Sequence, residues 1–115
     1  MANTFKVITK AGVTSADVIY TVAGSTTTII LGLMVGNTTS GAITSSVTLG
    51  TDTANRAGAN NETNQDVELI TSAAIPANSS LEFMGGNKII METTDTLTVT
   101  GSAAVDIALS VMEIT

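Results

Sequence analysis

The sequence predicts an all-β, single-domain protein: an antiparallel β-sandwich or jelly roll of about eight or nine short strands. Three observations predict this class. Threonine is the commonest residue, with 21 copies among 115 residues, and side chains branched at Cβ suit strands better than helices. Apolar side chains recur with a period of two over most of the chain. Turn residues interrupt the apolar runs about every 8–12 residues, as is typical of sandwiches.

The N-terminal segment predicts a strand. Thr4–Thr9 alternates in character, with Phe5 and Val7 on one face. We therefore expect residues 1–9 to form an N-terminal strand or arm. A turn over Gly12–Ser15 separates it from the next strand.

Two further strands are predicted before the first long polar turn. Asp17–Ala23 alternates and places Val18, Tyr20 and Val22 on the same face. Thr26–Gly36 becomes apolar on both faces in its second half. That pattern predicts a central strand that is covered on both sides.

A half-exposed strand and a long loop follow the polar turn at Asn37–Gly41. The odd-numbered residues of Ile43–Leu49 share one face, and the even-numbered residues are Thr or Ser. Residues 51–66 contain hardly any apolar side chain and predict a long polar loop, in which Asp52–Asn60 could hold one helical turn. Loops longer than about 12–15 residues are uncommon in compact domains unless they are functional or disordered.

The C-terminal half supplies the remaining strands. Val67–Thr71 is a strand that ends before the only proline. Leu81–Met84 and Lys88–Glu92 flank Gly85-Gly86-Asn87, and this predicts a β-hairpin because Gly and Asn accept positive φ angles.

Two strands then complete the fold. Leu97–Thr100 is short, and Val105–Met112 is the clearest amphipathic strand of the chain. We expect this last strand to pair inside a sheet. A chain of 115 residues is long enough for one core, so we assign a single domain over residues 1–115.

The charge balance argues against nucleic acid and membrane partners. The net charge is −6, and the four basic residues are scattered along the sequence rather than clustered as phosphate binding requires. A membrane-spanning helix needs roughly 20 apolar residues, and the longest apolar run, Ile29–Val35, is far shorter. We see no signal peptide, and therefore expect synthesis in the cytoplasm.

The chain lacks most of the groups that perform catalysis. It has no His and no Cys, so a nucleophilic Ser or Thr would have no imidazole base beside it. A metal site would have to use oxygen ligands alone, and the 51–66 loop lacks the regular spacing of a calcium loop. We therefore expect no enzymatic activity, no catalytic residues, no cofactor and no metal.

The surface is expected to be unusually poor in charge. The mean hydropathy is +0.40 and only 12% of residues are charged, which favours a surface that a partner covers in part. Two alternatives stay open: Phe5 and Phe83 could belong to the core, and the long loop could contact only water. The candidate partner-contact residues are Phe5, Val7, Arg56, Asn61, Phe83 and Met84.

Several fragments together resemble small virion structural proteins of tailed bacteriophages, especially those of marine and cyanobacterial hosts. The fragments are Val18-Ile19-Tyr20-Thr21, Gly32-Leu33 followed by Asn37, Ile75-Pro76-Ala77, Gly86-Asn87-Lys88-Ile89-Ile90-Met91-Glu92, Asp95-Thr96-Leu97 and Ser110-Val111-Met112-Glu113-Ile114. The likeness spans most of the chain, although each fragment alone is mostly strand and turn residues. Two departures are Val22-Ala23-Gly24, where similar proteins have a proline, and Thr94-Asp95 in place of a Gly-Asp turn.

The resemblance implies a non-enzymatic virion protein, above all a capsid decoration (cement) protein. Such a protein would bind the outer surface of the major capsid shell and stabilise it, as a homo-oligomer (trimer or dimer). It would be located at the capsid surface of the virion. Alternatives are a tail, adaptor or fibre-associated component, or a carbohydrate- or receptor-binding β-sandwich. The last idea requires exposed aromatic rings, and the chain has one Tyr, two Phe and no Trp.

Overall fold

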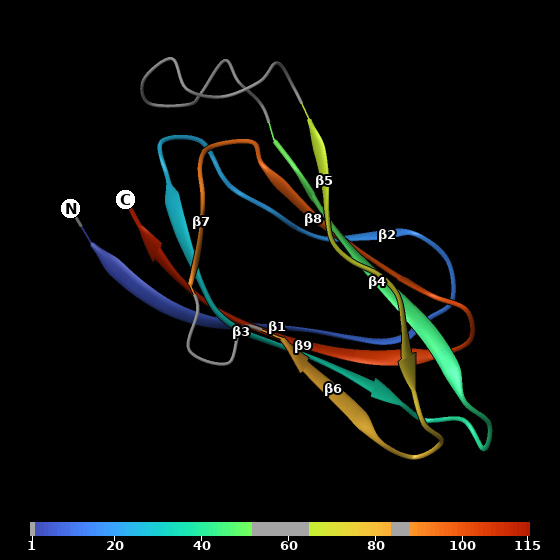
Figure 1. Cartoon of the computed structure of the whole chain (residues 1–115). Coiled ribbons are helices and arrows are strands. Elements are labelled where there is room, and N and C mark those ends of the chain that lie inside the picture. Colours follow the sequence, from blue (N-terminus) through green and yellow to red (C-terminus); the bar gives the residue numbers. More distant parts are fainter. Residues whose placement is uncertain (1, 52–64, 84–87) are drawn as a thin grey trace.

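The chain folds into two antiparallel β-sheets that pack face to face (Figure 1). The computed structural model describes residues 2–51, 65–83 and 88–115, and of Phe83 only the backbone. These residues form nine strands and no helix, so the predicted all-β sandwich is confirmed. Within the same residues, no helix is long and apolar enough to cross a membrane.

The first sheet contains both ends of the chain. Its order is β1-β9-β3-β6, and β7 also pairs with β3. The last strand lies between β1 and β3, as predicted, and Ala2 bonds to Thr115 beside it. The strands are β1 (Asn3–Val13), β9 (Val105–Ile114), β3 (Thr27–Asn37), β6 (Ser80–Phe83) and β7 (Ile89–Met91).

The second sheet has the order β2-β8-β4-β5. The odd-numbered residues of β4 are buried and the even-numbered ones are half-buried, as predicted. The backbones of Thr51 and Gln65 bond across the base of the predicted 51–66 loop, whose residues 52–64, with the expected helical turn, lie outside the described residues. The strands are β2 (Asp17–Thr21), β8 (Thr96–Gly101), β4 (Ile43–Gly50) and β5 (Asp66–Ile75).

The core lies between the two sheets and is almost entirely aliphatic. Each fully buried Val, Leu or Ile contributes on the order of 1.5–3 kcal/mol relative to an exposed one. All buried side-chain N and O atoms among the described residues have hydrogen-bond partners. The largest fully buried side chains are Ile30, Leu33, Ile75, Met91, Leu97, Leu109, Val22, Val35, Val47, Val99, Val105 and Val111.

The predicted hairpin over Leu81–Glu92 is wrong. β6 pairs with Leu33–Gly36 of β3, and β7 pairs with Thr28–Ile30 of the same strand. Both are antiparallel to β3, so they follow one another along its edge instead of pairing with each other. The 11-residue β3 is long enough to accept both. A local Gly and Asn signal indicates a break in a strand, but it does not determine whether the chain turns back on itself.

The prediction that Val18 shares a face with Tyr20 is also wrong. The pairing of β2 with β8 shifts register between Val18 and Tyr20. As a result Ile19 and Tyr20 are both buried, whereas Val18 is 51% exposed. An extra residue in one strand breaks the period of two, and the side chains beyond it change face.

Strand β3 is central, as predicted, but it is not covered on both sides. Ile30, Leu33 and Val35 face the core and are fully buried. On the opposite face Met34 is 44% exposed and Ile29 is only half-buried. The first sheet therefore presents an apolar outer face to solvent.

Candidate docking surface

Strand β1 carries the first two predicted contact residues on its outer side. Phe5 is 71% exposed and Val7 is 64% exposed, whereas Ile8 between Val7 and Thr9 packs against the core. This alternation follows from the unbroken pairing of Asn3–Lys10 with β9, because successive side chains of a strand point to opposite faces. Phe5 is therefore a surface residue and not part of the core.

The strand register aligns Phe5 with three other apolar residues across the outer face. Phe5 lies opposite Met112 of β9, Met112 lies opposite Ile29 of β3, and Ile29 lies opposite Ile90 of β7. Ile90 is 58% exposed, and Met112 and Ile29 are half-buried. We call the row of Phe5, Met112, Ile29 and Ile90 the outer stripe.

The rows next to the outer stripe are also almost free of charge. They extend the face along the strands with small and apolar side chains, and Glu82 at its far side is the first charged residue. One row contains Val7, Ser110 and Gly32, and the next contains Thr9, Ala108, Met34 and Glu82. The described part of the chain thus exposes a wide neutral surface over four strands.

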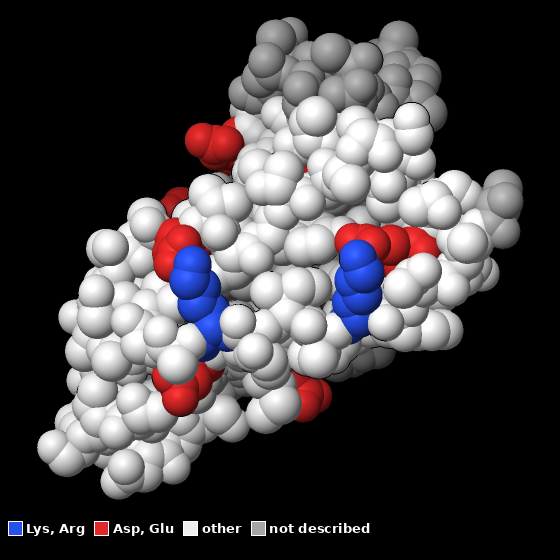
Figure 2. All heavy atoms as spheres, turned by 180° about the vertical axis from the view of Figure 1, so that it is seen from behind, with Lys and Arg blue, Asp and Glu red and all other residues white. Residues whose placement is uncertain are grey.

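The lysines of β1 do not place free charge on this surface. Lys6 Nζ lies 2.8 Å from Glu113 Oε1, and Lys10 Nζ lies 2.8 Å from Asp17 Oδ2. Figure 2 shows basic side chains lying against acidic ones on a face that is otherwise mostly uncharged. Each ammonium group is neutralised within its own molecule.

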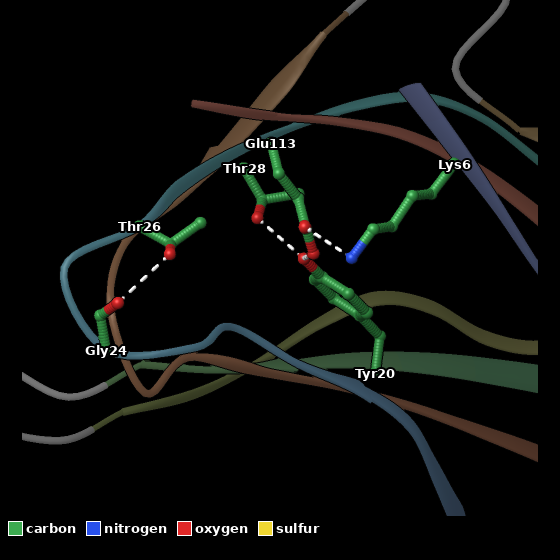
Figure 3. Close-up of polar contacts among 6 residues, drawn as sticks. All are labelled: Lys6, Tyr20, Gly24, Thr26, Thr28 and Glu113. Atoms are coloured by element: carbon green, nitrogen blue, oxygen red, sulfur yellow. Dashed lines mark hydrogen bonds and ion pairs between the residues drawn. The ribbon is translucent and has the colours of Figure 1, made fainter. Parts of the chain in front are cut away.

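A polar network joins the two sheets behind the outer stripe (Figure 3). The Tyr20 hydroxyl of β2 donates to Glu113 Oε2 of β9 over 2.6 Å and lies 2.7 Å from Thr28 Oγ1 of β3. Burial, and then the bond to Glu113, raises the pKa of Tyr20 to about 12. The bonds from Lys6 and Tyr20 lower the pKa of Glu113 below its ordinary value. The network holds β1, β2, β3 and β9 in place, and so supports the surface above it.

The described structure does not test the side chains of the other predicted contact residues. Arg56, Asn61 and Met84 lie outside the described residues. The Phe83 backbone pairs with Leu33 in β6, which is separated from β1 by β9 and β3.

The sequence did not lead us to name Ile29, Ile90 and Met112 as candidate contact residues. A signal was present, because β3 is apolar on both faces and Ile89-Ile90 is an apolar pair in a short strand. Strand order was needed to interpret it.

The described residues hold no group of three or more His, Cys, Asp or Glu side chains that could bind a metal ion. Tyr20 is 9% exposed and both of its hydroxyl contacts are internal, so its ring is not available to stack on a ligand. The outer face is therefore the surface with the clearest potential for function.

Comparison with known proteins gave few matches. No protein-family model and no curated protein matches the sequence. A solved structure described by the words "Bacillus endospore appendages form a novel family of disulfide-linked pili" is similar, with a TM-score of 0.48 and 17% identity. The similarity covers 97% of this chain and 84% of that chain. The present chain contains no cysteine.

Proposed function

We propose that the protein is a non-enzymatic structural component of a tailed-phage virion, specifically a decoration protein on the outer surface of the major capsid shell. The observation that carries this proposal is the outer stripe with its neutral neighbouring rows. Contiguous exposed apolar surface on a small protein usually marks an interaction site. Burying it against a capsid subunit would remove Phe5 and Ile90 from water.

The charge distribution supports a position outside the shell. The net charge is −6 and the described lysines of β1 are paired, so little positive charge is available to hold DNA. Acidic groups on the surfaces away from the stripe would keep the particle exterior solvated.

The size of the protein fits cooperative binding to a lattice. An ordinary stable interface buries about 800 Å² on each partner, which a small domain can supply from one sheet face. A homo-oligomer that contacts several capsid subunits gains further affinity without new contacts, because later binding events are intramolecular. We infer that the major capsid protein is the partner and that the functional unit is an oligomer.

Two other functions are alternatives. A tail, adaptor or fibre-associated component would use the same apolar face at a few sites per particle. A carbohydrate-binding sandwich would need an aromatic platform, and the burial of Tyr20 leaves Phe5 as the only exposed ring among the described side chains.

The deciding measurement is the copy number of this protein in purified virions of the phage that encodes it. Quantitative mass spectrometry against the major capsid protein should give a ratio near one, or one per few capsid subunits. A handful of copies per particle would move the protein to the tail. Absence from particles would overturn the virion assignment.

A further inference from the structure

Strand β1 leaves a long backbone edge unpaired. It pairs with β9 on one side, and no described strand pairs with its other side. Ala2 and Thr115 exchange both backbone hydrogen bonds, at 3.2 and 3.0 Å. Bonded pairs alternate along an antiparallel ladder, so the even-numbered residues from Ala2 to Lys10 bond to β9. The N–H and C=O groups of the odd-numbered residues Asn3–Thr9 therefore point away from the sheet.

From Asn3 to Lys10 this edge lacks the features by which natural proteins protect exposed edges, and the register shift of β1 lies beyond it, between Lys10 and Val13. Such features are bulges, prolines, very short strands and outward charges. The register of β1 is unbroken from Asn3 to Lys10, and the segment contains no proline. Both of its lysines are drawn into ion pairs within their own molecule. The segment Asn3–Lys10 is thus a regular and accessible template for another strand.

The remaining edges of the described structure are protected. β2 has 5 residues and an irregular register. β5 shifts register twice against β4, and its Ser72 has a φ of 50°. β6 and β7 have 4 and 3 residues. Among the described strands, β1 is therefore the edge to which a partner strand would most readily add.

We propose that β1 pairs antiparallel with β1 of a second copy, about a two-fold axis at Val7. In this register Val7 lies opposite Val7 of the second copy, and Phe5 lies opposite Thr9. Lys6 then lies opposite Ile8, and Lys10 lies opposite Thr4, so no lysine faces another lysine. An axis at Lys6 would place two ammonium groups directly opposite each other, which is unfavourable. This register therefore keeps the lysines of the two copies apart.

The pairing would join the first sheets of two molecules into one continuous sheet. Phe5, Val7 and Thr9 of each copy would supply about six ladder hydrogen bonds, two for each bonded pair. Paired residues point to the same side of a sheet, so the two outer stripes would lie on one common face. The dimer does not depend on the proposed place in a virion, and the two hypotheses can fail separately.

Sedimentation velocity of the full chain, from about 1 to 100 µM, tests the dimer directly. Val7→Pro is the sharpest variant, because the Val7 N–H points to the free edge and is not needed by β9. We expect a wild-type dimer, and a Val7→Pro monomer with an unchanged far-ultraviolet circular dichroism spectrum.

A matched pair of lysine variants guards against a folding defect. Val7→Lys should raise the dissociation constant of the dimer by at least about tenfold, because it places a charged side chain from each copy at the two-fold axis. Val18→Lys makes the same change on the edge strand β2 and should leave the dimer intact. A wild-type monomer at all concentrations would overturn the proposal. So would an oligomer that Val7→Lys does not weaken, or one that both lysine variants weaken equally.

Discussion

The Tyr20 hydroxyl and the Glu113 carboxylate meet across the two sheets at 2.6 Å, although the residues are 93 positions apart in the sequence. Tyr20 comes from β2 of the second sheet and Glu113 from β9 of the first. The carboxylate also receives Lys6 Nζ at 2.8 Å. A single acid thus connects three strands at one end of the sandwich, beside the outer stripe.

Tyr20 should make stability fall at alkaline pH. Its pKa is raised to about 12 by burial and by the bond to Glu113, so the neutral ring stabilises the fold fully below the ordinary tyrosine pKa. This stabilisation is lost as pH rises through about 12. Between pH 10 and 12 wild type should lose on the order of 1 kcal/mol relative to Tyr20→Phe, which does not titrate. Urea denaturation at several pH values measures the difference, and parallel curves would contradict the expectation.

Glu113 should produce the opposite dependence at acidic pH. Its pKa is lowered by Lys6 and then by Tyr20, so the ionised carboxylate stabilises the fold at neutral pH. That contribution is lost as pH falls through the folded-state pKa. Glu113→Gln should cost about 1 kcal/mol at pH 7 and little in acid. The exposed Glu68→Gln serves as the control and should change stability by less than about 0.5 kcal/mol at either pH.

Asn37 should be essential for stability. Its buried Nδ2 donates to the carbonyl oxygens of Gly41, Ile75 and Pro76 at 2.9–3.1 Å. Asn37→Asp replaces the donor with an acceptor that faces these carbonyls. We expect a loss of about 3 kcal/mol in chemical denaturation at pH 7, which lessens in acid as the carboxyl gains a proton.

The same substitution at an exposed asparagine is the control for Asn37. Asn78 is solvent-exposed with a φ of 57°, a conformation that Asp also adopts readily. Asn78→Asp should cost less than about 0.5 kcal/mol. Equal losses at the two positions would mean that the donor at Asn37 does not matter.

Gly101 should not tolerate a side chain. A Cβ there would lie 2.8 Å from the Val13 carbonyl oxygen and 2.6 Å from that of Ala103. Because both atoms belong to the backbone, Gly101→Ala should lower the unfolding free energy by about 1–3 kcal/mol. Thermal denaturation measures this loss. Gly24→Ala is the matched control, because a Cβ at Gly24 would meet nothing within 4 Å.

A substitution at Ile90 can test capsid docking without affecting the proposed dimer. Ile90 belongs to the outer stripe but lies three strands away from β1. Ile90→Ser should reduce co-sedimentation with capsids that lack the protein by about tenfold, from the lost apolar contact. Dimerisation and folding should not change. Val67→Ser removes a similarly exposed side chain from the second sheet and should bind normally. Normal binding by Ile90→Ser would exclude the outer stripe as the docking site.

The fragments that carry the phage resemblance are explained structurally by contacts between them. Tyr20 bonds to Glu113, and the Asn37 side chain bonds to the backbone of Ile75-Pro76. Asp95 Oδ2 accepts the Glu92 N–H at 2.9 Å. These residues hold strands and turns together. A sequence likeness at these positions therefore indicates a similar fold before it indicates a similar function.

The sequence by itself determined the fold class, the central place of the last strand and the exposure of one face of β4. Those features depend on alternation and turn chemistry, which act between residues close in the chain. Even there, the register shift beside Ile19 and the separate pairing of β6 and β7 with β3 altered the outcome, because a local pattern does not specify the partner strand.

Only the tertiary structure decided which apolar residues remain on the surface. Phe5, Ile29, Ile90 and Met112 come from four separate strands and become one row through register alone. In the sequence an outward isoleucine and an inward one look the same when both faces of a strand are apolar, as in β3. Strand order and register determine which face meets the other sheet, and they arise from contacts between residues that are distant in the chain.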